Sequence, residues 1–156
     1  MEYTLKPRSV SLNDGYDVIV AGGGPAGVAA AYSASREGAR VLLIEATGAL
    51  GGMSTMGMVP AWCPYSDGER IVYGGIAERM LKAGKDETRF VDPKMVNWVP
   101  INPETMKHLY DDLMTEGKVD VLFGTTVSAV DQEPGKVGTV IVTNKSGLTA
   151  YRAKIW

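Results

Sequence analysis

The sequence has few of the residues that build covalent or metal-held frameworks. It contains one cysteine, Cys63, and one histidine, His108. A lone cysteine excludes an internal disulfide framework and is typical of a reducing compartment, so we expect a cytoplasmic location. One cysteine and one histidine also leave no credible zinc site. We expect Cys63 to be a small buried thiol and His108 to be solvated, because it falls with Asp111 and Asp112 on the polar side of a predicted helix.

An excess of charge of one sign is also lacking. The 16 basic and 18 acidic residues give a formal net charge of −2, and no basic patch indicates a nucleic-acid or anionic membrane partner. The N-terminal MEYTLKPRSVSLNDG has no apolar core of the signal-peptide kind. The apolar stretch from Val18 to Ala34 is short and interrupted by glycines and Pro25, which argues against a membrane span. The chain has the length of one domain, and its 19 glycines cluster.

The first cluster lies between two apolar runs. Asp17–Ala21 and Arg40–Glu45 are predicted to be buried strands, because their apolar residues are continuous rather than alternating. Pro25–Glu37 between them is predicted to be a helix, with proline at its first position and Gly38 at its C-terminal cap. Such a βαβ crossover is right-handed and makes the two strands parallel.

The rest of the chain adds helices and an antiparallel region. Residues 1–15 are expected to form a loose arm, and residues 53–101 an irregular insertion. Turn signals and alternating apolar residues predict a β-meander over residues 126–155. The predicted fold class is therefore α/β: a Rossmann-like dinucleotide-binding domain with a parallel sheet and an antiparallel meander. The further elements expected are helices at Gly75–Ala83 and 103–116, the second capped by Asn102, and strands at Asp120–Gly124, 126–132, 137–143 and 148–155.

Three glycines form a G-x-G-x-x-G motif where the first strand becomes the helix. Gly22 allows the tight turn, Gly24 lets a pyrophosphate approach the backbone, and Gly27 lets helix and strand pack closely. The helix N-terminus offers amide N–H groups and a positive dipole end to the phosphates. The motif therefore predicts a site for the ADP part of a dinucleotide.

The second strand ends in an acid, Glu45, about 20 residues after the glycines, as the fingerprint requires. Its carboxylate can accept hydrogen bonds from a ribose diol. It would repel a 2′-phosphate, which disfavours NADP. The fingerprint alone does not separate NAD from FAD.

The next stretch, ATGALGGMSTMGMVPAWCP, is more specific. With this stretch added to the glycine motif and Glu45, the sequence resembles the FAD-dependent oxidoreductases of the glutathione-reductase-like superfamily. More narrowly, it resembles a bacterial family that carries E-x-x-x-x-L-G-G-M-x-T-x-G. The resemblance extends over the chain after Gly15.

The resemblance implies FAD as the cofactor and an unknown small molecule as the substrate. The pyrophosphate would be cradled by the turn, the adenosine ribose bound by Glu45 with Ala46 beside it, and the adenine contacted near Val127. The second glycine pair would pass close to the ribityl chain, and the three residues after it would lie beside the flavin ring rather than in the core. The implied residues are Gly22, Gly24, Pro25, Ala26 and Gly27 for the pyrophosphate, Gly51 and Gly52 for the ribityl part, and Met53, Ser54 and Thr55 for the ring. No catalytic residue is identified.

The sequence also departs from relatives of this kind. Disulfide reductases of the superfamily carry a C-x-x-x-x-C pair, whereas this chain has only Cys63, which excludes dithiol chemistry. In the family the meander runs on into a parallel strand ending in Asp-Ala-Thr-Gly, so we expect the chain to be an N-terminal fragment without a substrate domain. Such a fragment is expected to be inactive and to hold FAD weakly. The strand Asp17–Ala21 would then have an open apolar edge, which predicts a homo-oligomer.

Two other functions remain open at this stage. A thiazole-synthase-like protein uses a similar arrangement of glycines and an acid to hold NAD, and a dinucleotide-binding module without catalysis would have the same motif.

Trp62, Tyr65 and Trp98 are candidates for a pocket lining or for aromatic core. The charged residues Asp86, Glu87 and Arg89 are expected in a solvated loop.

Overall fold

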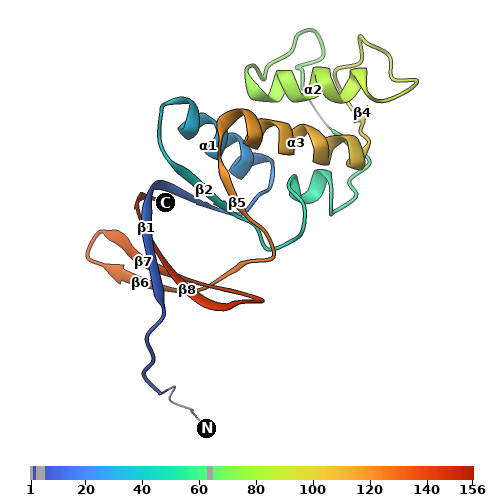
Figure 1. The fold of residues 1–156 in the computed structure, drawn as a ribbon. Coiled ribbons are helices and arrows are strands. Elements are labelled where there is room, and N and C mark those ends of the chain that lie inside the picture. The colour runs from blue at the N-terminus through green and yellow to red at the C-terminus, as the bar shows by residue number, and fades with distance from the viewer. Residues whose placement is uncertain (1, 3–5, 63–64) are drawn as a thin grey trace.

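The computed structural model describes residues 2, 6–62 and 65–156 of the chain; Cys63 lies outside them. Its main element is a six-stranded sheet with the strand order β5-β2-β1-β8-β7-β6 (Figure 1). The strands are β1 (Ser11–Ala21), β2 (Val41–Ile44), β5 (Asp120–Leu122), β6 (Thr126–Glu133), β7 (Lys136–Asn144) and β8 (Gly147–Ile155).

Half of this sheet is parallel. β1 pairs in parallel with β2, from Val18 opposite Val41 to Ala21 opposite Ile44, and β2 pairs in parallel with β5. All four residues of β2 are buried, as its continuous apolar sequence predicts for a strand covered on both faces. Helices α1 (Pro25–Arg36) and α3 (Pro103–Gly117) lie on one face of these strands (Figure 1). The predicted βαβ unit is therefore present.

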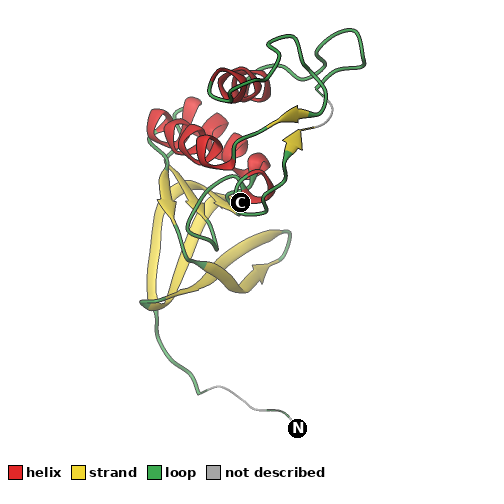
Figure 2. Cartoon of the chain, turned by 90° about the vertical axis from the view of Figure 1, so that its right-hand side faces the viewer, coloured by secondary structure: helices red, strands yellow, loops and turns green. Residues whose placement is uncertain are grey.

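The other half is the predicted antiparallel meander of β6, β7 and β8. It turns back across the face of the parallel strands opposite the helices (Figure 2). Val140 and Val142 of β7 pack there in one buried cluster with Ile19, Leu42 and Ile44. The parallel strands are thus enclosed between helices and meander.

The structure corrects two expectations about β1. The strand begins at Ser11 rather than Asp17, so residues 11–15 are not part of a loose arm. The edge of β1 is covered only from Ser11 to Val18, where β8 runs parallel to it, from Ser11 opposite Thr149 to Val18 opposite Ile155; β8 pairs with none of residues 19–21, the rest of the expected open edge. The meander's own last strand supplies this neighbour, so the expected open edge is wrong at Asp17 and Val18, while an open edge at residues 19–21 and the homo-oligomer stay predictions.

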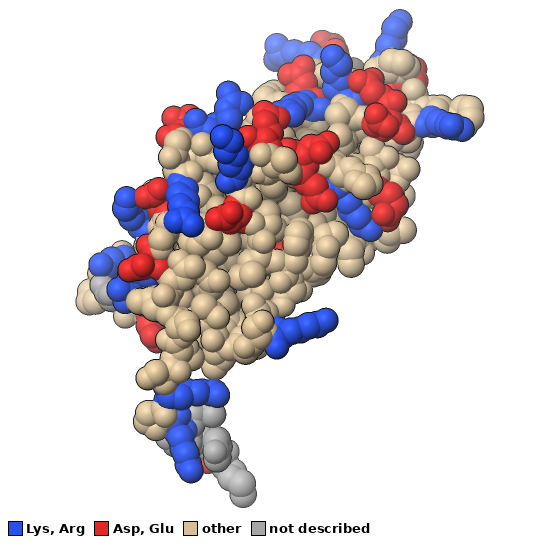
Figure 3. Space-filling view, in the orientation of Figure 1, with Lys and Arg blue, Asp and Glu red and all other residues tan. Residues whose placement is uncertain are grey.

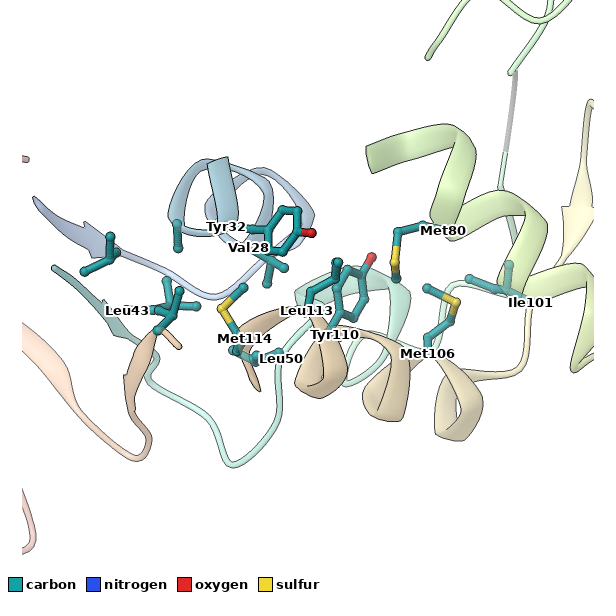
Figure 4. Packing of buried hydrophobic residues seen from close by; sticks show 13 residues of the cluster. Val28, Tyr32, Leu43, Leu50, Met80, Ile101, Met106, Tyr110, Leu113 and Met114 are labelled. Atoms are coloured by element: carbon teal, nitrogen blue, oxygen red, sulfur yellow. The ribbon is translucent and has the colours of Figure 1, made fainter. Parts of the chain in front are cut away.

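The insertion over residues 53–101 contains regular elements. These are the end of a short 3₁₀ turn, η1 (Gly52–Ser54), the strands β3 (Ala61–Trp62) and β4 (Val99–Pro100), which form a two-stranded antiparallel sheet, and α2 (Ile76–Asp86). Helix α2 packs on α3 through buried side chains that include Met80 and Met106 (Figure 4). The helix α3 starts as predicted, with the Asn102 side chain accepting a 3.0 Å hydrogen bond from the Glu104 N–H.

One polar cluster joins the three helices. The hydroxyl of Tyr32 on α1 donates to the carboxylate of Glu116 on α3. Arg79 on α2 binds the same carboxylate at 2.6 Å and also donates to the Tyr32 hydroxyl at 3.2 Å. The two hydrogen bonds from Arg79 and Tyr32 hold the pKa of Glu116 at about 2.

Charged side chains of both signs are interspersed over the helical part of the surface, whereas the strand part of the same face is mainly uncharged (Figure 3). No helix within the described ranges combines the length and apolarity needed to cross a membrane. His108 is exposed on α3, and Asp86, Glu87 and Arg89 are exposed at and after the end of α2, all as expected.

Candidate functional site: the glycine-rich turn

The turn between β1 and α1 has the geometry that its glycines predict. Gly22 has a φ of +106°, a conformation that side chains rarely adopt, and its N–H donates a 2.7 Å hydrogen bond to the Ile44 carbonyl of β2. A Cβ at Gly27 would lie 1.8 Å from the Gly22 carbonyl oxygen. Only glycine fits at position 27, and the first turn of α1 therefore packs directly on the end of β1.

The other side of the turn is open. Gly24 is the N-cap residue of α1, no side chain caps the helix there, and a Cβ at Gly24 would meet no atom within 4 Å. Gly22, Pro25 and Ala26 are exposed. The first N–H groups of a helix have no partner within the helix, and they carry the positive end of its dipole. This open start of α1 can therefore bind an anionic group such as a phosphate.

The carboxylate of Glu45 lies against the same turn. Glu45 is only 8 % exposed; its Oε2 accepts a 2.6 Å hydrogen bond from the Gly23 N–H, and its Oε1 accepts one of 2.7 Å from the Thr47 N–H. Burial alone would raise the pKa of the Glu45 carboxyl, but hydrogen bonds from Thr47 and Gly23 hold that pKa below its ordinary value. The group is therefore ionised at neutral pH. Each of its oxygens has a second lone pair for a ligand hydroxyl.

The second pair of glycines lies beside the first motif. The Gly51 N–H donates a 2.8 Å hydrogen bond to the Gly23 carbonyl, and a Cβ at Gly52 would lie 3.2 Å from the Cα of Gly24. Gly51 has a φ of +100°. Two segments that are separated by β2 thus lie against each other. Gly22, Gly24 and Gly52, which are exposed or partly exposed, form what we call the glycine surface, with Gly51 buried behind it. Ala46, next to Glu45, is exposed at its edge.

The three residues after this pair do not all face outward. Met53 is 65 % exposed, whereas Ser54 and Thr55 are buried. Ser54 donates to the Gly51 carbonyl at 2.7 Å, and Thr55 donates to the Leu50 carbonyl at 2.5 Å. The expectation that the side chains of Ser54 and Thr55 lie outside the core is wrong, because their hydroxyls are used to satisfy the backbone of this tight segment.

Tyr110 on α3 supports the same segment, a role that the sequence did not reveal. A Cβ at Gly51 would lie 2.5 Å from the Tyr110 ring, and the Tyr110 hydroxyl lies 3.0 Å from Oγ of Ser54. Tyr110 is also part of the buried core of its helix. A buried tyrosine hydroxyl usually has a hydrogen-bond partner, and this is the one feature of the sequence that could have indicated a polar contact of Tyr110.

The start of β6 lies close to Glu45 on the other side. The Thr125 N–H donates to the Glu45 carbonyl at 3.0 Å, and the Gly124 N–H donates to the Thr47 carbonyl at 3.0 Å. Val127, two residues further on, is 36 % exposed. The structure therefore brings Val127, Glu45 and the glycine surface to one end of the parallel strands, where open α/β sheets bind ligands.

A pocket of about 400 Å³ opens on the helical side of this surface, between α1, α2 and α3. Trp62 and Tyr65 line it together with Pro25 and Tyr110. Trp98 is not among its lining residues and is 70 % exposed. Of the three aromatic candidates from the sequence, two therefore form part of a pocket. Within the described residues, no group of three or more His, Cys, Asp or Glu side chains is arranged to hold a metal ion.

Comparison with known proteins identifies relatives. One curated relative, the soluble pyridine nucleotide transhydrogenase of Marinomonas sp. (strain MWYL1), is 51 % identical over 47 residues, which is 30 % of this chain and 10 % of that protein. The crystal structure of THI4 from Thermovibrio ammonificans is similar with a TM-score of 0.61 and 17 % identity, over 90 % of this chain and 55 % of that one. A 3-ketosteroid-Δ4-(5α)-dehydrogenase from Rhodococcus jostii RHA1 gives a TM-score of 0.62 and 16 % identity, over 93 % of this chain and 45 % of that one.

These solved structures establish a Rossmann-like dinucleotide-binding fold, and the chain spans about half of their length or less. The sequence pattern of the family described as FAD dependent oxidoreductase matches residues 17–156, which include the glycine-rich turn, Glu45 and the meander. The chain therefore belongs to the FAD dependent oxidoreductase family, whose cofactor is FAD.

Proposed function

We propose that this chain is the N-terminal, cofactor-binding part of a FAD-dependent oxidoreductase of the glutathione-reductase-like superfamily, of bacterial type. The observation that carries the proposal is the open, uncapped start of α1 at Gly24, with the ionised carboxylate of Glu45 beside it. An anion-binding helix start and a diol-binding acid are what the ADP part of FAD requires.

The residues present fit this part of the cofactor. Space is open in front of Gly24, where a pyrophosphate would approach, while position 27 is closed by the Gly22 carbonyl. In the proposal the pyrophosphate lies against Gly22, Gly24, Pro25, Ala26 and Gly27, and the ribose against Glu45 and Ala46. Val127 lies toward the adenine. The ribityl chain passes Gly51 and Gly52, and Met53, exposed after them, lies toward the flavin ring.

When bound, FAD supplies the two-electron chemistry of the reaction. The residues of this chain hold and orient it: the helix start fixes the phosphates, and Glu45 fixes both the ribose and the turn. Ser54, Thr55 and Tyr110 keep the second glycine pair in place from behind. The substrate is proposed to be a small molecule. The single cysteine supports a cytoplasmic setting, and a homo-oligomer remains a proposal.

Equilibrium dialysis of the purified chain against FAD, NAD and NADP in separate experiments tests the proposal, since dialysis also detects weak binding. We expect FAD to bind and NADP to bind least, because the Glu45 carboxylate repels a 2′-phosphate. Binding of NAD without FAD would support the thiazole-synthase-like alternative instead. Binding of none of the three would contradict the proposal.

A further inference from the structure

The pocket between the three helices lies next to the glycine surface but is not part of it. Its volume of about 400 Å³ is within the range of about 300–1,000 Å³ of small-molecule sites. Pro25, at the first position of α1, lies on its border with the turn. Tyr110 lines the pocket and also contacts the second glycine pair. A molecule in this pocket would therefore share two walls with the dinucleotide site.

Part of the pocket wall is aromatic. The ring centroids of Trp62 and Tyr65 are 5.6 Å apart, and those of Tyr65 and Tyr73 are 6.0 Å apart with the rings at 85° to each other. The aliphatic part of the lining includes Met80 and Leu113, which are buried in the helical core (Figure 4). Aromatic side chains make favourable offset-stacked and edge-to-face contacts with other rings, so this part of the wall suits a flat aromatic ligand.

The described part of the lining carries no formal charge. Among the described residues that line the pocket there is no aspartate, glutamate, lysine or arginine. The polar side-chain groups of the described wall are tyrosine hydroxyls and the indole N–H of Trp62, all uncharged. Burial raises the pKa of Tyr65 to about 12, so that hydroxyl remains a neutral donor. The Tyr110 hydroxyl is already paired with Ser54. A charged ligand would lose its hydration here without gaining a partner of opposite charge.

We propose that this pocket binds a neutral molecule with a flat apolar ring system. The binding site follows from the lining, the volume and the absence of charge along its described wall. Its use as the substrate site of the oxidoreductase rests on the proposed function, because it depends on a cofactor in the neighbouring glycine surface.

A matched pair of probes tests the chemistry of the ligand. 2-Naphthol is a neutral bicyclic molecule at pH 7, and 2-naphthoate has the same ring system with a negative charge. Dialysis of the purified chain against each probe should give at least tenfold tighter binding of 2-naphthol. Equal or tighter binding of 2-naphthoate, or no binding of 2-naphthol, would overturn the proposal.

Two substitutions on the same helix test the location. Ala29 lines the pocket, whereas its neighbour Ala30 is exposed and does not. Ala29→Leu should fill part of the space and weaken 2-naphthol binding at least tenfold, and Ala30→Leu should leave it unchanged. Ala77→Leu fills the pocket from α2 and serves in place of Ala29→Leu if that variant does not fold. Equal binding of 2-naphthol by the wild type and a folded filling variant would place the probe elsewhere and contradict the proposal.

FAD dialysis on the same samples separates this proposal from the proposed function. Neither Ala29 nor Ala77 belongs to the glycine surface, so both filling variants should bind FAD as the wild type does. Binding of 2-naphthol without binding of FAD would leave the pocket assigned and refute the cofactor site. Binding of FAD without binding of 2-naphthol would support the cofactor site and refute the assignment of the pocket.

Discussion

The Gly23 N–H donates a 2.6 Å hydrogen bond to the buried carboxylate of Glu45. The bond joins the end of β2 to the turn that follows β1, and the second oxygen of the same carboxylate holds the Thr47 N–H. Glu45 is therefore a structural residue of the turn as well as the proposed ribose ligand. Its substitution has two effects that must be measured separately.

We predict that Glu45→Gln lowers both stability and FAD binding. An amide accepts only one of the two backbone hydrogen bonds, so unfolding without ligand should become easier by about 1–3 kcal/mol. Glu37→Gln, at an exposed position after α1, is the matched control and should change neither quantity. Urea unfolding gives the first quantity and dialysis the second. An unchanged stability of Glu45→Gln would contradict the structural role.

The pH dependence of Glu45 has a defined sign. Its pKa in the folded chain is lowered, so its ionised form stabilises the fold above the ordinary pKa of 4.5, and this contribution disappears as the pH falls through the folded value. Urea unfolding curves of the wild type and of Glu45→Gln should therefore differ at neutral pH and converge in acid. A difference that grows in acid would contradict this sign.

We predict different effects on stability for the substitution of Gly27 and of Gly24 by alanine. Gly27→Ala places a Cβ 1.8 Å from the Gly22 carbonyl oxygen, so the backbone must shift, and we expect a loss of about 1–3 kcal/mol. Gly24→Ala meets open space at an ordinary φ of −67°, and should stay within about 0.5 kcal/mol of the wild type. Chemical unfolding of the two variants side by side is the measurement. Equal stabilities would mean that the turn is not packed as described.

Much of the fold could be predicted from the sequence because its signals are local. The glycines, Pro25 and the apolar strands define the βαβ unit within about thirty residues, and turn signals define the meander. The first half of β1 could not be predicted in this way. Ser11–Gly15 is polar and lacks an alternating pattern, and its partner, β8, is remote in the sequence.

In the candidate site, too, features set by local sequence could be predicted and contacts between remote segments could not. The motif placed Gly22, Gly24, Gly27 and Glu45 at one turn, as the structure does. The motif could not show that Thr55 is buried, because a hydroxyl next to glycines can either contact a ligand or donate a hydrogen bond to the local backbone. Tyr110 was missed as a support for the second glycine pair because its contact joins segments that are distant in sequence.

Ser54 and Tyr110 should be energetically coupled. Their hydroxyl oxygens are 3.0 Å apart in the core, so Ser54→Ala and Tyr110→Phe should each cost about 1 kcal/mol or more. The double variant should lose less than the sum, because the second substitution removes a bond that is already broken. Stability measurements on the four proteins complete this cycle. Strict additivity would show that the two hydroxyls do not interact.

The cluster of Tyr32, Arg79 and Glu116 should contribute to acid sensitivity. Hydrogen bonds from Arg79 and Tyr32 hold the pKa of Glu116 at about 2, below its ordinary 4.5. Its stabilising effect is thus complete above about 4.5 and is lost as the pH falls toward 2. Glu116→Gln should flatten this part of the stability profile, while Asp112→Asn, exposed on the same helix, should not. Added salt should weaken the effect, since the ion pair is half exposed. An identical acid limb in Glu116→Gln and the wild type would contradict the role.

The cofactor site at the start of α1 is tested most directly by the FAD dissociation constant of Gly24→Val, compared with the wild type and with Gly74→Val. Both glycines have open space where a Cβ would lie and neither has a positive φ, but only Gly24 lies at the start of α1. We expect both variants to melt at the wild-type temperature, Gly74→Val to bind FAD normally, and Gly24→Val to bind it at least tenfold more weakly. A folded Gly24→Val with wild-type affinity for FAD would contradict the assignment of the cofactor to this turn.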